Sequence, residues 1–352
     1  MQGANSVQER KDMTKNPSSG ASTPKHQYIT RTAEFVSPGH PDKICDILAD
    51  FILDLYLAKD SNARVAVEVM GGHGEIVVCG EITSAAKIDI ENKVRARVGN
   101  KYRIRINLVR QSPEIARGVD CGGAGDQGVM VGYACAENGQ LLPTEYVLAR
   151  DLCQKIYSQY PYDGKTQITV RLNYNAKHEF VSATIKHIVV SWQKVSSKNL
   201  AAEITLWINN LPNNIKICKN LKISINPAGD WDLGGFDADT GLTGRKIVID
   251  NYGPRVPVGG GAFSGKDPSK VDRSAAYMAR KVAVDYLRKY HANEVYVFIA
   301  YALGEAKPVD ATVVIDGKME RIKGYNLSPR GIIKQLNLLE PRYEKRAKWG
   351  HF

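Results

Sequence analysis

A glycine-rich stretch, residues 259–274, combines the residue types that phosphate chemistry requires. It reads GGGAFSGKDPSKVDRS, and five glycines fall within residues 253–265. Glycines allow a backbone to approach a ligand closely, and free N–H groups at a helix start attract anions. Lys266 and Lys270 add two cations, and Asp272 could hold a divalent metal beside the same phosphates. The stretch therefore predicts an anion-binding loop.

The helix that presents this loop is predicted to start at Asp267 and Pro268, as N-cap and first-turn proline. Apolar residues then recur on one helix side from Val271 onward. The stretch is not a Walker motif, because Asp267 follows Lys266 where that motif has a hydroxyl. Taken alone, it also fits a glycine-rich surface loop before a capped helix.

A second candidate site lies at the start of the first predicted helix of the chain. His40 and Asp42 precede apolar residues at helical spacing. A histidine at a helix start can donate to an oxyanion, and an adjacent carboxylate can hold magnesium; a His-Pro turn with a good cap is the alternative. Acidic residues also recur at every fourth position, and apart from Asp42 we expect this acidic stripe to be a solvated face: Asp42, Asp46, Asp50 and Asp54.

The elements that position these residues form three units of strands and helices. The first unit is predicted to hold strands 63–70, 75–82 and 103–110 with a helix at 85–97. Glu68 and Glu81 lie on its strands, where a carboxylate usually has a cation or ligand as partner.

The second unit begins with a ligand-type loop, in which glycines surround Asp126. Its predicted strands are 129–136, 167–174, 181–191 and 221–225, with helices at 144–159 and 200–210. The third unit is predicted to hold strands 247–250, 294–303 and 311–316, the helix after Pro268, and a helix at 328–339. We expect an α+β fold with domains at 28–112, 113–228 and 229–352, after a disordered basic tail at 1–27.

Composition limits the remaining functions. No apolar run approaches the ~20 residues of a membrane span, and the six cysteines lack paired spacing. We therefore expect no membrane partner, no signal peptide and a cytoplasmic location. The net charge of +11 raises nucleic acid as a partner. However, the basic residues at 101–110 alternate with apolar ones as in a half-buried strand, and polyphosphate ligands explain a positive charge equally well, so we expect no nucleic acid.

Four segments in this order resemble methionine adenosyltransferase, the S-adenosylmethionine synthetase family, in a somewhat divergent bacterial type. They are residues 39–46 (GHPDKICD), 123–128 (GAGDQG), 239–246 (DTGLTGRK) and the glycine-rich stretch. The family makes S-adenosylmethionine from ATP and methionine. The methionine sulfur attacks ribose C5′ and expels triphosphate, which is hydrolysed to pyrophosphate and phosphate. A catalytically silent, regulatory nucleotide-binding relative is the alternative.

The resemblance also implies roles for individual residues. His40 would steady the triphosphate as the C5′–O bond breaks, and the catalytic cations would be Lys165, Arg245 and Lys266, with Lys246 as a further phosphate ligand. ATP would also meet Asp163, Asp230, Trp231, Asp239 and the backbone at Ala262. Asp42 and Asp272 would bind magnesium, two ions per site, and Glu68 would bind potassium. Methionine would be held by Glu81, Gln111, Asp126, Asp239 and Lys270.

The family fold is three α+β domains with pseudo-threefold symmetry, in homodimers or dimers of dimers whose active sites lie between subunits. This chain departs from the usual pattern at Asp230 and Trp231, where relatives have Arg-Phe. It also has fewer residues between Asp120 and Asp126, in the region where relatives have a mobile cover over the site. We expect a shorter cover, made of residues 112–123.

Overall fold

A computed structural model describes residues 27–112 and 122–352 of the protein. The predicted tail lies outside the described residues except for Gln27, which opens the first strand. The predicted short cover, residues 112–123, also lies mostly outside them. No helix in the described ranges is long and apolar enough to cross a membrane.

The first third of the chain forms the predicted helices and strands and, in addition, one strand that the sequence did not predict, β1 (Gln27–Val36). The others are α1 (Pro41–Leu57), β2 (Arg64–Gly72), β3 (Glu75–Thr83), α2 (Ile90–Val98) and β4 (Arg103–Val109). Helix α2 begins later than the predicted residue 85. Asp89 is its N-cap and accepts the Asn92 N–H at 3.1 Å. The Ala85 N–H is instead taken by the Asp60 carboxylate at 2.9 Å, which holds this segment outside the helix.

The middle third of the chain is also a mixture of strands and helices. It comprises β5 (Gly128–Cys135), α4 (Thr144–Gln159), β6 (Gly164–Tyr174), β7 (Phe180–Trp192), α5 (Ser197–Asn209) and β8 (Ile215–Ile225). Strand β8 is about twice as long as predicted. The prediction missed its first half because that half carries exposed polar residues such as Lys216 and Lys219. An edge strand tolerates such residues, since one of its sides meets solvent.

The last third contains one wrong prediction of element type. Its elements are η1 (Gly235–Asp237), β9 (Gly241–Leu242), α6 (Ile247–Asp250), α7 (Val271–Tyr290), β10 (Glu294–Tyr301), β11 (Asp310–Ile315), β12 (Lys318–Arg321), α8 (Pro329–Leu336) and α9 (Tyr343–Ala347). Residues 247–250 form a helical turn, not a strand. Their apolar, β-branched composition favours a strand, but the Asp250 N–H bonds back to the Lys246 carbonyl at 2.9 Å.

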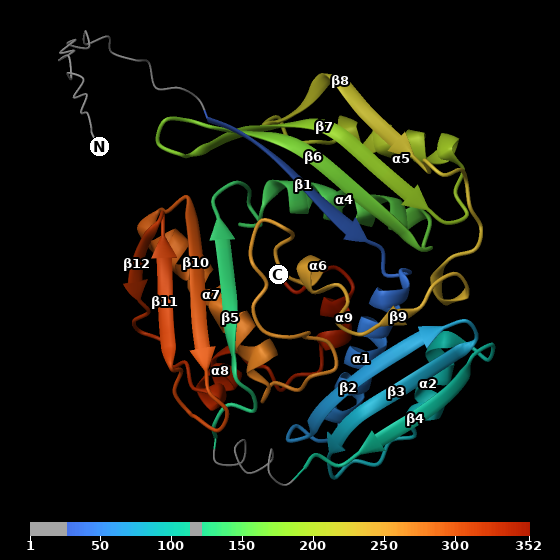
Figure 1. Cartoon of the computed structure of the whole chain (residues 1–352), viewed down its shortest axis with the longest axis vertical. Helices are drawn as coiled ribbons and strands as arrows, with labels where there is room; N and C mark the ends of the chain where they lie inside the picture. Colours follow the sequence, from blue (N-terminus) through green and yellow to red (C-terminus); the bar gives the residue numbers. More distant parts are fainter. Residues whose placement is uncertain (1–26, 113–121) are drawn as a thin grey trace, which may run out of the picture.

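Three four-stranded sheets surround the middle of the molecule, which confirms the α+β class (Figure 1). Their strand orders are β1-β6-β7-β8, β12-β11-β10-β5 and β4-β3-β2-β9. Each sheet therefore takes a strand from another third of the chain: β1 pairs with β6, β5 with β10 and β9 with β2. The domain limits 28–112, 113–228 and 229–352 remain a proposal, and the sheets exchange strands across them.

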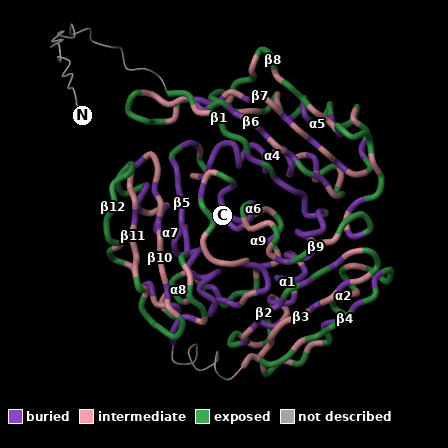
Figure 2. The backbone as a smooth tube through the Cα atoms, in the orientation of Figure 1, coloured by how far each residue is buried: buried purple, intermediate pink, exposed green. Residues whose placement is uncertain are grey.

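Helices α1 and α7 lie in the interior and belong to one hydrophobic core with β2, β3 and β10. A second core joins β1, β6 and β7 to α4 and α5. Both α1 and α7 are buried over most of their length (Figure 2). Because both helices begin at predicted site residues, the first of these cores fixes the starting points of the site.

Residues 349–352 pack into the centre between the sheets, where Figure 1 marks the C-terminus. The His351 ring is buried, and its Nδ1 lies 2.7 Å from the Tyr277 hydroxyl. The backbone N–H of His351 donates to the Asp250 carbonyl at 3.0 Å. Burial, reinforced by the nearby Arg273 cation, lowers the pKa of His351 well below its usual value. The folded protein therefore keeps this imidazole neutral.

We expect His351 to make the protein less stable as the pH falls below about 6.5. The unfolded chain takes up a proton there while the folded chain does not, so the free energy of unfolding decreases with falling pH. Between pH 7.5 and pH 5, the free energy of unfolding should decrease by about 2 kcal/mol less in His351→Gln than in the parent. Urea unfolding at both pH values measures this difference. Equal losses in the two proteins would contradict the buried neutral state.

Candidate active site

The acidic stripe on α1 is not a solvated face, and this prediction was wrong. Each of its four carboxylates accepts backbone N–H groups from the last third of the chain, at 2.8–3.0 Å. The pairs are Asp42 with Leu242, Asp46 with Gly244, Asp50 with Gly265, and Asp54 with Tyr343 and Glu344. A carboxylate that accepts N–H groups can be buried at low cost. Helix α1 thus sets the position of both predicted phosphate-binding segments.

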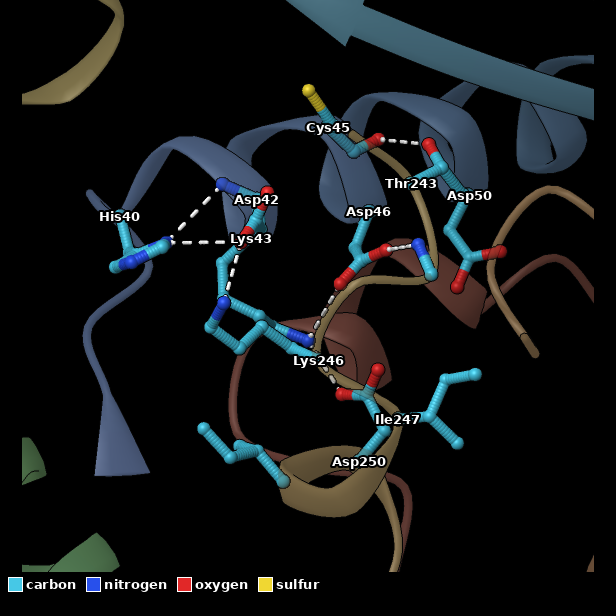
Figure 3. Close-up of polar contacts among 12 residues, drawn as sticks. His40, Asp42, Lys43, Cys45, Asp46, Asp50, Thr243, Lys246, Ile247 and Asp250 are labelled. Carbon is cyan, nitrogen blue, oxygen red and sulfur yellow. Dashed lines mark hydrogen bonds and ion pairs between the residues drawn. The ribbon is translucent and has the colours of Figure 1, made fainter. Parts of the chain in front are cut away.

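Two buried cations balance this stripe. Lys43 Nζ lies 3.2 Å from Asp46 and 2.5 Å from Asp250 (Figure 3). All three side chains are almost fully buried. Arg273 donates to both Asp50 oxygens at 2.7 Å. Burial raises the pKa of Asp46 to about 7, against the opposing effect of Lys43. Sequence reasoning missed these residues. The sequence did contain a signal for them. Acidic residues at four-residue spacing beside an apolar helix face also fit a helix face that packs against another segment.

The first cluster of site residues forms at the start of α1. Asp42 lies between two cations, with Lys246 Nζ at 2.5 Å and Arg245 Nη1 at 3.4 Å. His40 is the N-cap residue, and its Nδ1 accepts the Asp42 N–H at 3.2 Å. This assignment places the ring proton on Nε2. Burial, then Lys246, lowers the pKa of His40 to about 3, so the imidazole is neutral and can donate one hydrogen bond.

A cavity of about 470 Å³ opens beside His40, and it contains most of the predicted ATP ligands. Its wall includes His40, Asp163, Lys165, Asp230, Trp231 and Asp239. Burial raises the pKa of Asp163, whose carboxylate accepts the Gly235 N–H at 2.9 Å. Asp230 accepts hydrogen bonds from Ser197 Oγ at 2.6 Å and from the Asn226 amide at 2.8 Å. Asp230 thus ties its loop to the start of α5.

The second cluster lies on the glycine-rich stretch. Lys266 Nζ contacts Asp272, whose other oxygen accepts the Gly261 N–H at 2.9 Å. Gly265 has φ +80°, and a Cβ there would lie 1.9 Å from the Val67 carbonyl oxygen, so only glycine fits against β2. The two clusters are neighbours, because a Cβ on Gly244 would lie 2.7 Å from the Ala262 Cβ.

Helix α7 starts three residues later than predicted. Lys270 is its N-cap, and the helix runs from Val271. Asp267 instead bonds to strand β2 and to the turn that follows it. Its carboxylate accepts the Val65 N–H at 2.8 Å and the Ser269 N–H at 2.9 Å. Lys270 Nζ is buried 2.5 Å from the same carboxylate. Asp267 therefore joins the loop to the sheet rather than capping the helix.

The remaining predicted residues lie on or near the N-terminal sheet. Glu68 is exposed on β2 and Glu81 is half-buried on β3, so both lie on strands as predicted. The Gln111 N–H donates to Thr83 Oγ1 at 3.2 Å, and Asp126 is exposed in its loop. Among the described residues, no recorded hydrogen bond or ion pair joins Glu68, Glu81 or Asp126 to either cluster.

The carboxylates of the two clusters fit a divalent metal that arrives with a phosphate. Asp42 and Asp272 each pair with a lysine ammonium, so a positive charge already lies beside each carboxylate. Within the part of the chain that the structure describes, no group of three or more metal-ligating side chains occurs. Magnesium commonly uses one or two carboxylates and completes its shell with water and substrate phosphate. The donor set is of that kind.

Two adjoining clusters of cations and carboxylates beside a nucleotide-sized cavity are typical of enzymes that act on a polyphosphate. Family models agree and are more specific. The S-adenosylmethionine synthetase N-terminal domain matches residues 28–109, its central domain 121–231 and its C-terminal domain 233–352. The chain belongs to the S-adenosylmethionine synthetase family.

Similar proteins that match along most of their length are named S-adenosylmethionine synthase. The S-adenosylmethionine synthase of Myxococcus xanthus is 41% identical, over 91% of this chain and 89% of the relative. That of Salinibacter ruber is 40% identical over 91% and 92%, and that of Petrotoga mobilis is 38% identical over 91% and 92%. This similarity confirms the resemblance seen in the four segments.

Proposed function

We propose that this chain forms S-adenosylmethionine from ATP and methionine with the two clusters described above. Relatives named S-adenosylmethionine synthase match over nine-tenths of the chain, and nothing supports the catalytically silent alternative. The observation that supports the site assignment is the pairing of each cluster carboxylate with lysine or arginine cations, Asp42 with Lys246 and Arg245, and Asp272 with Lys266.

The chemistry demands such cations. When methionine sulfur attacks ribose C5′, the C5′–O bond breaks and its electron pair leaves with the triphosphate. Fixed donors lower the barrier where this negative charge increases. In the proposed site, His40 donates from Nε2 to the departing oxygen, and Lys165, Arg245, Lys246 and Lys266 bind the phosphates. Magnesium at Asp42 and Asp272 would add positive charge beside those phosphates.

The remaining assignments extend this proposal. Trp231 stacks on adenine, with Asp163, Asp230, Asp239 and the Ala262 backbone around the nucleotide. The amino and carboxylate groups of methionine are bound by Asp239, Lys270, Glu81, Gln111 and Asp126. Potassium is bound by Glu68. Lys270 forms an ion pair with Asp267. This pair orients the ammonium group that donates to methionine and balances its charge.

A second copy of the chain is part of the proposal, as a homodimer or a dimer of dimers in the cytoplasm. The sheets expose large apolar side chains that an oligomer would cover: Met70, Val109 and Val129 are 46%, 58% and 47% exposed. Within residues 27–112 and 122–352, no hydrogen bond or ion pair joins Glu81 or Asp126 to either cluster. Both residues would then complete a site on the other subunit. Light scattering after gel filtration measures the mass, and a monomer at micromolar concentration would contradict this part.

The metal assignment predicts a higher magnesium requirement in Asp42→Asn and Asp272→Asn. Each substitution keeps the shape and an acceptor for the backbone N–H but removes an anionic metal ligand. We expect the magnesium concentration for half-maximal binding of a non-hydrolysable ATP analogue to rise on the order of tenfold. Calorimetric titration gives this value independently of turnover. Asp54→Asn, on the same stripe but beyond the site, is the control; parent-like titration of both site variants would make these carboxylates structural.

A further inference from the structure

The segment that carries Arg245 and Lys246 is held at three consecutive backbone positions. The Leu242 N–H donates to Asp42 at 3.0 Å, and the Thr243 N–H donates to the Val69 carbonyl at 2.9 Å. The Gly244 N–H donates to Asp46 Oδ1 at 2.9 Å. Gly244 has φ +83°, a conformation that other residues rarely adopt. The last of these three contacts therefore sets the backbone from which both cationic side chains leave.

Asp46 reaches this segment from inside the protein. Its side chain is fully buried, and its Oδ2 faces Lys43 Nζ at 3.2 Å. The same ammonium lies closer to Asp250, at 2.5 Å. One cation thus faces two carboxylates, and if Asp46 lost its charge, Lys43 and Asp250 would remain a balanced pair. What Asp46 alone supplies is an acceptor for the Gly244 N–H.

We propose that Asp46 is a positioning residue for the reaction: by accepting the Gly244 N–H, it sets where Lys246, and with it Arg245, place their cations. The inference rests on the proposed phosphate-binding roles of these two residues. Helix α1 contacts both the backbone and the side chain of this segment. Asp46 accepts the Gly244 N–H, and Asp42, one turn earlier, contacts Lys246 Nζ (Figure 3). Displacing a binding group by about 1 Å can cost about 100-fold in rate, so a lost backbone anchor matters to turnover.

The test compares two substitutions at this position. Asp46→Ala removes the acceptor, and we expect kcat/KM for ATP to fall about 10- to 100-fold, with KM for methionine nearly unchanged. Asp46→Asn keeps an amide oxygen that can accept the Gly244 N–H and leaves the Lys43–Asp250 pair. It should stay within about threefold of the parent, since the acceptor is retained. Equal impairment of both variants, or a folded Asp46→Ala with parent kinetics, would overturn the proposal.

Asp54→Ala is the matched control for a loss of stability. Asp54 lies two turns after Asp46 on the same face and also accepts backbone N–H groups, from Tyr343 and Glu344. Its removal should lower Tm but leave both KM values and kcat unchanged. If Asp54→Ala reduces kcat/KM for ATP as much as Asp46→Ala does, Asp46 acts through general stability and the proposal is wrong.

A double substitution distinguishes failure of this inference from failure of the proposed function. If Asp46 acts through Lys246, then adding Asp46→Ala to Lys246→Ala should cost much less than it does in the parent. Effects that multiply fully would show that Asp46 acts elsewhere, and would overturn the inference. Parent-like kinetics of Lys246→Ala alone would instead overturn the phosphate-binding role of Lys246.

Discussion

His40→Ala should form S-adenosylmethionine about 10² to 10³ times more slowly than the parent, the usual cost of removing one preorganised donor at a developing charge. The neutral ring accepts the Asp42 N–H through Nδ1 and so presents Nε2–H to the departing oxygen. Its pKa of about 3 means that lowering the pH from 8 to 6 should not alter its protonation in the free enzyme. Single-turnover measurement with saturating ATP and methionine gives the rate of the chemical step.

His40→Asn is the control that separates catalysis from helix capping. His40 caps α1, and losing a cap costs about 0.5–2 kcal/mol of stability. Asparagine is a preferred N-cap residue, so His40→Asn should recover the stability that His40→Ala loses while remaining slow. Near-normal rates in either folded variant would show that His40 is structural and does not assist the departure of triphosphate.

Arg255→Met should destabilise the protein by about 3–5 kcal/mol, the usual cost of removing one partner from a buried charge network. Arg255 donates to Glu145 at 2.9 Å and to Glu137 at 3.1 Å, and the three side chains are 6%, 1% and 4% exposed. Burial alone would raise the pKa of Glu137, but Arg255 outweighs it and holds that pKa below its usual value. Without Arg255, two buried carboxylates would face each other. Urea unfolding at pH 7 measures the loss.

The destabilisation should be relieved in two ways. At pH 5, protonation of the unpaired carboxylates should reduce the difference between Arg255→Met and the parent. In the triple variant with Glu137→Gln and Glu145→Gln, most of the stability should return, because no uncompensated charge remains buried. A deficit of the same size at both pH values and in the triple variant would indicate lost packing of the Arg255 side chain instead.

Local patterns in the sequence were sufficient for the fold class and most elements. The apolar spacing of α1 and the alternation of β2 and β3 are properties of single segments, so the sequence identifies them directly. Local patterns failed where a distant segment intervened. Residues 247–250 look like a strand but form a helical turn, and Asp267 looks like a helix cap but is held by β2.

Most candidate site residues could also be predicted from the sequence, because His40, Lys246, Lys266 and their neighbours occur in dense, specific motifs. The acidic stripe shows the limit of such prediction. A carboxylate at every fourth helix position looks the same whether it faces water or the backbone of another segment. Which of these holds depends on the packing of α1 against residues 242–265 and 343–344, contacts about 200 to 290 residues apart in the chain. The sequence by itself thus determined which residues could do the chemistry. The fold decided that Asp46, Asp50 and Lys43 hold those residues in place, because a buried carboxylate is stable only where a distant N–H or cation meets it.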